Sequence, residues 1–306
     1  HPTHPGAIHL YIHAVEASAT PDRALPYADR LGAQMPGAGH IVHMPAHIYY
    51  RVGQYRQSLA VNRHAIAVDE AYFRTSPSDP LYKSAYYPHN IHFVMVSAQA
   101  GGDGRTALEA AAKLDASLPD DVVRAFAILQ PVKAAPYTTH AQFSGPEAIL
   151  ALPAPPEDLA LVRTMYHYAR AVAYAGRRDA AGAGREIDAI RALEAKTDFK
   201  AFAEWQVPAK EVMQTARLVA SARLADATGD LAAAQAAYED AIFVEDTLAY
   251  MEPPFWYYPV RQSLGAALLK AGKPDEAQAE FRAALDSTRG SPWALYGLQQ
   301  AAKAKG

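Results

Sequence analysis

The sequence predicts an all-α protein, built as an α-solenoid of about six helix pairs with a Pro-rich interruption. Two observations predict this fold class. Strand-like alternation of apolar and polar residues is almost absent, whereas Ala, Leu, Glu and Arg recur at helical spacing along most of the 306 residues. A pattern of small and aromatic residues also returns at an interval of roughly 34 residues, which is typical of stacked helix pairs.

The clearest helix pair lies near the C-terminus. Its small and large residues follow the spacing of the tetratricopeptide repeat (TPR): Gly265, Leu268, Gly272, Ala277, Phe281 and Ala284. The small residues let the two helices approach closely, and Phe281 is expected to fill the space between them. Gly272 is expected to make the turn, and Pro274 to lie in the first turn of the second helix, where proline is tolerated.

The same frame fits further pairs upstream, each with a glycine at the turn. These glycines are Gly53, Gly102, Gly176 and Gly229. A first pair over 5–33 fits when Ala24 takes the position of a small packing residue. In this frame Pro5 and Pro88 both fall at the head of a first helix, where proline is acceptable. A last helix is expected near 291–304.

The frame divides the chain into three segments. Residues 1–117 hold the His-rich pairs, 118–157 form a Pro-rich linker, and 158–306 hold the C-terminal pairs. The linker contains seven prolines, so we expect a short helix around 121–130 and otherwise irregular chain.

Composition excludes several classes of function. The net charge of -3 gives no reason to expect nucleic acid as a partner, and the absence of cysteine excludes disulfides, thiolate ligands and iron–sulfur clusters. No apolar run approaches the roughly 20 residues of a membrane span, so we expect a soluble protein. Because the chain begins at His1, it is expected to be a processed or truncated piece, and its location, periplasmic or cytoplasmic, stays open.

Histidine is concentrated in the first third of the chain, where ten of the twelve fall within 92 residues. Seven of them take positions that face the concave groove of consecutive first helices. We therefore predict that these seven are metal ligands: His9, His13, His40, His43, His47, His89 and His92. Several of them are spaced i,i+3 or i,i+4, so each such pair can reach one ion from a single helix face.

The ligand set indicates a transition metal. Imidazole nitrogen suits Zn, Cu, Ni or Fe(II), whereas Mg and Ca prefer oxygen. Seven histidines exceed one four-coordinate site, so one or two ions per chain are expected. Glu16 and Tyr50 share the groove and are the predicted catalytic residues. In a hydrolytic enzyme Glu16 or a spare histidine would act as base, and in an oxidative enzyme the metal would activate oxygen.

Two residues near the second histidine helix have a structural interpretation. Pro45 lies inside a predicted helix, removes a backbone donor and is expected to kink it between His43 and His47. Asn62 takes a repeat position that usually holds a large packing residue. We interpret Asn62 as a partner for the carbonyl of Ile41, which Pro45 leaves without its helical donor.

Three segments carry a resemblance to a known family. HPGAIHLYIHAVE (4–16), HIVHMPAHIYYRVGQY (40–55) and HNIHF (89–93) resemble the motifs HPGxxHxxIH and HxxHMPxHI of a bacterial family of TPR-repeat proteins. The resemblance implies a TPR fold and a bacterial source. It also implies that a helical region precedes this segment in the full-length chain, and that this missing N-terminal segment is a possible partner. It implies no particular reaction.

The leading hypothesis is a metal-dependent enzyme, hydrolytic or oxidative, that acts on a small-molecule substrate. A protein-interaction scaffold, the usual role of TPR arrays, is one alternative. TPR grooves that hold a terminal carboxylate need Lys or Arg, and the first three pairs have none at the groove positions, which weakens this version of the scaffold. Metal storage or delivery without turnover is the other alternative.

Overall fold

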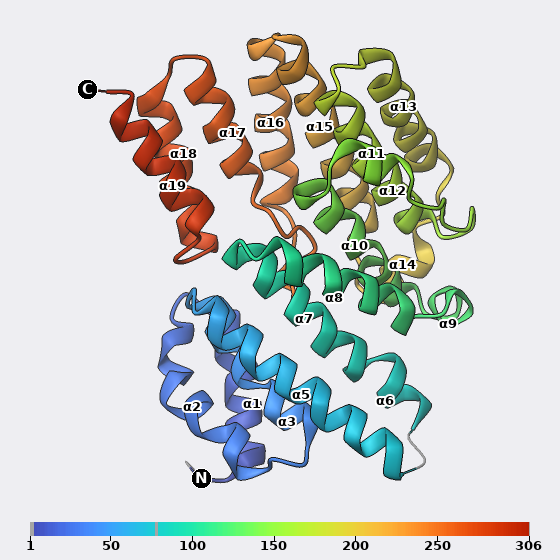
Figure 1. Ribbon diagram of the computed structural model, residues 1–306, viewed down its shortest axis with the longest axis vertical. Coiled ribbons are helices and arrows are strands. Elements are labelled where there is room, and N and C mark those ends of the chain that lie inside the picture. Colours follow the sequence, from blue (N-terminus) through green and yellow to red (C-terminus); the bar gives the residue numbers. More distant parts are fainter. Residues whose placement is uncertain (1–2, 77–78, 306) are drawn as a thin grey trace. The chain divides into compact units, whose positions relative to one another are not determined.

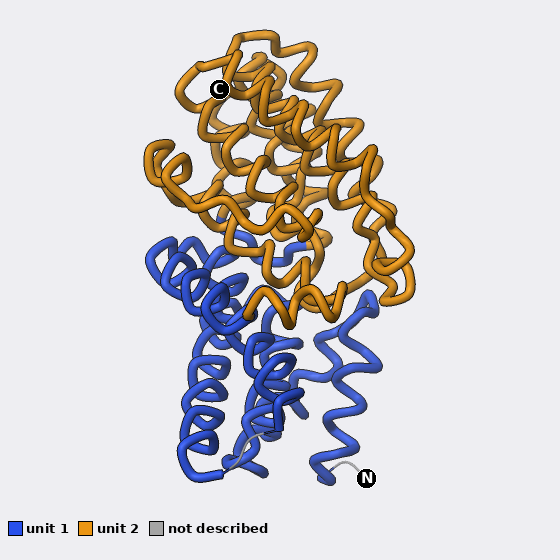
Figure 2. Tube along the Cα trace, turned by 90° about the vertical axis from the view of Figure 1, so that its right-hand side faces the viewer, with its two compact units in different colours: residues 1–118, 288–292 blue, residues 119–287, 293–306 orange. Residues whose placement is uncertain are grey.

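The computed structural model describes residues 3–76 and 79–305, and within these ranges every regular element is helical (Figure 1). The predicted all-α class is therefore confirmed. The chain forms two compact units (Figure 2). Unit 1 comprises residues 1–118 together with 288–292, and unit 2 comprises 119–287 together with 293–306. Among the described helices, none combines the length and the apolar character that crossing a bilayer requires.

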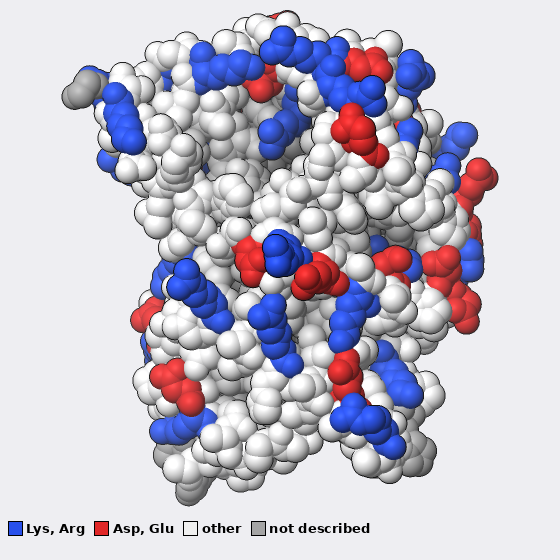
Figure 3. Space-filling model, viewed as in Figure 1, with Lys and Arg blue, Asp and Glu red and all other residues white. Residues whose placement is uncertain are grey.

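Unit 1 contains the histidine-rich part of the chain. Its elements are α1 (Pro5–Glu16), η1 (Pro21–Ala24), α2 (Leu25–Gln34), α3 (Gly39–His43), α4 (Pro45–Arg51), α5 (Tyr55–Thr75), α6 (Pro80–Ser84), α7 (Tyr86–Gly101) and α8 (Gly104–Ser117). Helices α3 and α4 pack on α5, and α5 and α8 both pack on α7. Figure 3 shows Lys and Arg interspersed with Asp and Glu over unit 1, so this face carries no extended patch of one sign.

The predicted turn glycines lie where the helices end. Gly53 and Gly102 have φ angles of 82° and 81°, in the left-handed region that glycine adopts without a Cβ penalty. Gly229 and Gly272 take the same conformation in unit 2. At Gly176 the expected turn is displaced, because helix α12 ends at this residue and the left-handed residue is Arg178 instead.

Pro45 interrupts the second histidine helix, as predicted. Helix α3 ends at His43, Met44 forms a turn, and α4 begins at Pro45. Proline has no N–H, so it is tolerated at the first position of the new helix but not in the interior of a continuous one. His43 and His47 therefore stand on two short helices joined at this break.

The apolar core of the first three helices holds α1 in position. Ile8 and Ile12 lie one helical turn apart on α1 and are buried against Leu31 of α2 and Ile48 of α4. Burying an aliphatic side chain of this size contributes roughly 1.5–3 kcal/mol. His9 and His13 each follow one of these isoleucines in the sequence. Packing of the isoleucine face therefore fixes the orientation of the adjacent face of α1, which carries the two histidines.

Unit 2 is built mainly from long helices packed in neighbouring pairs. Its elements are α9 (Asp120–Ala125), η2 (Ala127–Leu129), α10 (Gln130–Phe143), α11 (Pro146–Leu150), α12 (Ala160–Gly176), α13 (Ala180–Lys196), α14 (Lys200–Glu204), α15 (Ala209–Thr228), α16 (Leu231–Glu245), α17 (Val260–Lys270), α18 (Pro274–Ser287) and α19 (Pro292–Lys303). Helix α12 pairs with α13, α15 with α16, and α17 with α18.

The Pro-rich segment 118–157 is more regular than predicted. The expectation of irregular chain beyond 121–130 is wrong, because α10 runs for 14 residues and packs on α12. Pro131 lies in the first turn of α10, where its missing N–H would have no helical partner in any case. Pro136 lies inside α10 and is buried together with Ala134 and Ala135. The number of prolines alone overestimated the irregular part of this segment, because the position of a proline within a helix decides whether the helix continues.

A first prediction concerns the packing around Phe281. Gly297 of α19 lies against this ring so closely that an added Cβ would stand 2.3 Å from a ring carbon. Overpacking of this kind costs about 1–3 kcal/mol, so Gly297→Ala should lower the unfolding free energy by that amount in urea titrations. Gly184→Ala is the matched control, because its Cβ meets nothing within 4 Å. Inside helix α13 it should stabilise by roughly 0.5–1 kcal/mol. Equal effects of the two variants would contradict this packing.

Candidate metal centre

Six of the seven predicted histidine ligands come together in unit 1. They come from four helices: His9 and His13 from α1, His40 and His43 from α3, His47 from α4 and His89 from α7. Their rings form a continuous chain in which neighbouring centroids lie between 4.6 and 6.1 Å apart. The helical frame that was read from the sequence therefore placed these six side chains on facing surfaces.

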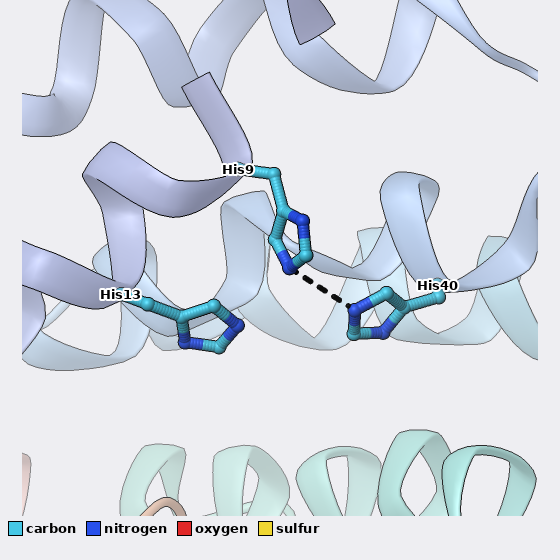
Figure 4. A group of neighbouring side chains, drawn as sticks. All are labelled: His9, His13 and His40. Carbon is cyan, nitrogen blue, oxygen red and sulfur yellow. Dashed lines mark hydrogen bonds between the residues drawn. The ribbon is translucent and has the colours of Figure 1, made fainter. Parts of the chain in front are cut away.

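The first group of potential ligand atoms belongs to His9, His13 and His40. One nitrogen from each ring lies within 4.8 Å of the others. The Nε2 atoms of His9 and His40 are 3.2 Å apart. Figure 4 shows the His9 ring directed toward His40, with His13 on the other side of His9. All three side chains are partly buried, so this group keeps some access to solvent.

The second group belongs to His43, His47 and His89, whose ligand atoms also lie within 4.8 Å of one another. His43 and His47 are fully buried, and their Nε2 atoms are only 2.7 Å apart. Phe93 of α7 covers this group, because its ring centroid lies 5.0 Å from His43, 4.8 Å from His47 and 5.0 Å from His89. The second group is therefore enclosed by helices and an aromatic ring.

The protonation of His43 follows from its partner on α5. Its Nδ1 lies 2.6 Å from Oδ1 of Asn62, and Nδ2 of Asn62 donates to the carbonyl of Ser58 at 2.7 Å. Because the amide nitrogen is engaged with Ser58, the amide oxygen faces His43 and accepts a hydrogen bond from Nδ1–H. Nε2 of neutral His43 then carries a lone pair, directed at His47.

Glu16 fixes His47 and His13 in the same way. This carboxylate is only 1% exposed, and its Oε2 accepts from Nδ1 of His47 at 2.7 Å. Its Oε1 accepts from Nδ1 of His13 at 2.6 Å. Glu16 therefore contacts one member of each histidine group. A carboxylate that accepts from the second ring nitrogen is the usual orienting partner of a metal-ligating histidine.

These hydrogen bonds leave two lone pairs directed at one another. The Nδ1 atoms of His43 and His47 both donate, so their Nε2 atoms, 2.7 Å apart, both carry lone pairs when the rings are neutral. Two such lone pairs repel unless a cation lies between or beside them. Two nitrogens that bind one tetrahedral ion at about 2.0–2.1 Å lie roughly 3.3 Å apart. Binding a shared ion would therefore require a small separation of these two rings.

The environment of two of these rings, His43 and His9, favours their neutral form. The pKa of His43 lies well below its ordinary value, chiefly because the ring is buried and further because His47 and His89 would carry the same charge. The pKa of His9 is also lowered, first by burial and then by His13 and His47. Metal ions bind the neutral form of imidazole, so the lowered pKa values of His43 and His9 favour the form that coordination requires.

The structure does not bring His92 into either group. His92 is buried, 3% exposed, and lies one turn beyond His89 on α7. Tyr50, predicted as catalytic, lies at the end of α4, where its ring contacts Tyr55 and Phe93 at centroid distances of 5.5 and 6.0 Å. The ring of Phe93, which Tyr50 contacts, in turn contacts the buried rings of His43 and His47.

Asn62 has a different role from the one predicted. The expectation that it satisfies the carbonyl of Ile41 is wrong, because its oxygen accepts from His43 and its nitrogen donates to Ser58. Its unusual place in the repeat was the only signal in the sequence. A buried polar side chain at a packing position needs a partner, and here that partner is a histidine ring.

The remaining histidines have other roles. His4 caps the start of α1, where its ring accepts from the backbone N–H of Ala7, and His1 lies outside the described residues. His64 is exposed on α5. In unit 2, Nδ1 of His140 lies 2.9 Å from the hydroxyl of Ser144, and Nδ1 of His167 lies 2.6 Å from Glu186.

A second prediction follows from the burial of His92. Burial lowers its pKa to about 3, whereas an exposed histidine has a pKa near 6.5. Below pH 6.5 the unfolded chain therefore binds a proton that the folded chain does not. Folding stability should fall as the pH decreases from 6.5 toward 3, by about 1.4 kcal/mol per pH unit for this residue alone.

Urea unfolding of the metal-free protein at pH 7 and pH 5 measures this effect. The contribution of His92 amounts to about 2 kcal/mol over the window from 6.5 to 5. His92→Leu should reduce the dependence on pH by that amount. A variant with the same dependence as the unmodified protein would show that His92 titrates normally in the folded state.

Comparison with protein-family models gives no match for this chain, and comparison with curated proteins gives no significant match. Membership of the bacterial TPR family therefore stays a prediction from the motifs. The described residues nevertheless contain histidine groups that can hold a metal ion.

Proposed function

We propose that unit 1 holds two transition-metal ions in its two histidine groups and is the catalytic part of a metal-dependent enzyme. The observation that carries the proposal is the pair of buried Nε2 atoms of His43 and His47, 2.7 Å apart, each on a ring whose Nδ1 donates elsewhere. Facing lone pairs favour a cation at this position, and a third imidazole, that of His89, lies within reach of the same position.

A metal ion fits the site better than a shared proton. A shared proton would join only the two facing nitrogens of His43 and His47, whereas three imidazoles converge in each group, as a metal ion requires. The Nε2 atoms of His9 and His40 are 3.2 Å apart, and one neutral ring can donate to the other, so this pair needs no proton of its own. Three imidazoles in each group match Zn, Cu, Ni or Fe(II), and they leave a coordination position for water or substrate.

The two groups differ in the role that they suit. The group of His43, His47 and His89 is largely buried, which favours tight retention of an ion. The group of His9, His13 and His40 is partly exposed on all three members, so substrate has access to it. The metal there would supply a polarising charge or a redox centre, and hydrolysis and oxidation both remain consistent with the ligand set.

Glu16 acts as a positioning residue in this proposal. Both carboxylate oxygens already accept hydrogen bonds from His13 and His47, and the side chain is 1% exposed. A carboxylate in this position is poorly placed to take a proton from a substrate. Its contribution is to hold Nδ1–H of each ring, which directs the opposite nitrogen toward the ion.

Elemental analysis tests the proposal directly. Protein purified without a metal-affinity column and reconstituted separately with Zn, Cu, Ni and Fe(II) should retain close to two equivalents of at least one metal after desalting. Removing the metal with a chelator should lower the melting temperature, because a ligand that binds only the folded state stabilises it. Retention below about a tenth of an equivalent for all four metals would refute the proposal.

A further inference from the structure

A small cavity opens beside His40 in unit 1. It has a volume of about 260 Å³ and is lined by residues from the α2–α3 loop, α3, α5 and the start of α6: Gly37, Ala38, Gly39, His40, Asp69, Tyr72, Asp79 and Tyr82. Pockets for drug-sized ligands are usually about 300–1,000 Å³, so this cavity suits a smaller molecule. Because His40 belongs to the partly exposed histidine group, a molecule in the cavity lies next to that group.

The wall of the cavity contains a buried carboxylate. Asp69 is 1% exposed, and its two oxygens accept hydrogen bonds from the hydroxyl of Tyr82 and from Nδ2 of Asn90, both at 2.8 Å. Both partners are neutral. Among the described residues Asp69 forms no ion pair with Lys, Arg or His, so none of them supplies a countercharge to this carboxylate.

The absence of a side chain at Gly39 makes room for the carboxylate of Asp69. A Cβ added to Gly39 would stand 1.8 Å from Oδ1 of Asp69, which means that the carboxylate occupies the space of a side chain at position 39. Any other residue there would displace it. The glycine therefore allows the carboxylate to lie directly against the start of α3, one residue from His40.

The rest of the lining favours a positive ligand. Asp79 contributes a second carboxylate, and none of the described residues that line the cavity is Lys or Arg. Tyr72 and Tyr82 supply aromatic rings 6.5 Å apart, and the ring of Tyr86 lies 5.3 Å from Tyr82 and 4.7 Å from His40. Aromatic faces attract organic cations, and a buried carboxylate without a countercharge is costly unless one binds.

We propose that this cavity binds the ammonium or guanidinium group of a small organic cation. Asp69 pairs with the cationic group, Asp79 adds a longer-range attraction, and the tyrosine rings contact the carbon chain. The remainder of the ligand then points along Tyr86 toward His9, His13 and His40. This inference rests on the proposed function, since it makes a small amine or guanidine compound the substrate of that metal centre.

Ligand-observed NMR titration tests the inference with three probes of one shape: butylammonium, 1-butanol and butyrate. Butylammonium should bind the metal-loaded protein, whereas 1-butanol and butyrate should bind at least tenfold more weakly. Asp69→Asn keeps the size of the side chain and should weaken butylammonium binding at least tenfold while leaving the metal content unchanged. Glu109→Gln is the matched control, since it removes one exposed carboxylate from α8 of the same unit and should change neither quantity.

Several results would overturn the inference. Equal binding of butylammonium and 1-butanol would show that charge is not recognised. Butylammonium binding unchanged in Asp69→Asn would place the ligand elsewhere. Displacement of butylammonium by Mn²⁺ from the cavity of protein already loaded at the histidines would make a hydrated metal ion the occupant.

Two further measurements keep the outcomes separable. Should Asp69→Asn not fold, the preference of the unmodified protein for butylammonium over 1-butanol decides, together with Asp79→Asn, which should weaken binding about twofold to fivefold. Asp69-dependent binding of butylammonium by a protein that retains no metal would refute the proposed function and keep the cation site. Stoichiometric metal binding without butylammonium binding would refute the cation site and keep the proposed function.

Discussion

His47→Ala is expected to abolish metal binding in the buried group and to eliminate any activity that depends on it. His47 supplies one of the two facing Nε2 atoms, and its ring also links this group to Glu16. Without it, His43 and His89 cannot complete the coordination of an ion. Elemental analysis after reconstitution should therefore show the loss of about one of two equivalents. The helices should persist by circular dichroism, because the core of unit 1 is formed by other residues.

Two histidine variants serve as controls for His47→Ala. His64→Ala removes an exposed ring from α5 of the same unit, and His167→Ala removes a ring from unit 2. Both should retain the full metal content. His13→Ala should instead lose the ion of the partly exposed group. Full metal content in His47→Ala would show that the facing nitrogens hold only a proton.

Glu16→Gln is expected to weaken metal binding in both groups at once, by roughly 10- to 100-fold. An amide has one acceptor oxygen and one donor nitrogen, so it can accept from His13 or from His47 but not from both. The other ring then meets an N–H group and must change its tautomer or rotate. Competition titrations with a chelator of known affinity measure the loss for each equivalent.

Glu186→Gln is the matched control for Glu16→Gln. Glu186 accepts from Nδ1 of His167 at 2.6 Å, which repeats the carboxylate–imidazole contact in unit 2 between two residues that belong to neither histidine group. This variant should lose folding stability without any change in metal affinity. If Glu16→Gln affected only one equivalent, the carboxylate would serve one group and not two.

The period of the helices was enough to predict which face of unit 1 carries the histidines. The positions of His9, His13, His40, His43 and His47 relative to the turn glycines indicated one groove, and the structure places their rings in contact. For α1 this worked because Ile8 and Ile12 form one buried apolar side, which determines the direction of the side that carries His9 and His13.

The same reasoning could not separate His89 from His92. Helix α7 is buried from Pro88 to Gln99 with the exception of His89 itself, which is partly buried. A helix that is buried on almost every side has no polar face from which its orientation can be read. Only the contacts of the folded chain show that His89 meets α3 and α4.

Contacts between residues far apart in the sequence also escaped prediction. Asn62 orients His43, which lies 19 positions earlier in the sequence. Asp69 accepts a hydrogen bond from Asn90, which lies 21 positions later. Neither pair belongs to a local motif, and each depends on how α5 packs against α3 and α7. The sequence contained only the indirect sign that polar residues stand where packing residues are usual.

If both groups hold an ion, as proposed, the single carboxylate of Glu16 would make the two ions thermodynamically dependent on one another. An ion on His47 would polarise that ring, strengthen its hydrogen bond to Oε2 and withdraw electron density from Oε1, the acceptor of His13. The second ion would then meet a less basic imidazole and the repulsion of the first charge. Loading would therefore be anticooperative, and by linkage each ion would weaken the other equally. At limiting metal most molecules would hold a single ion, and the partly exposed group would fill only as metal becomes abundant.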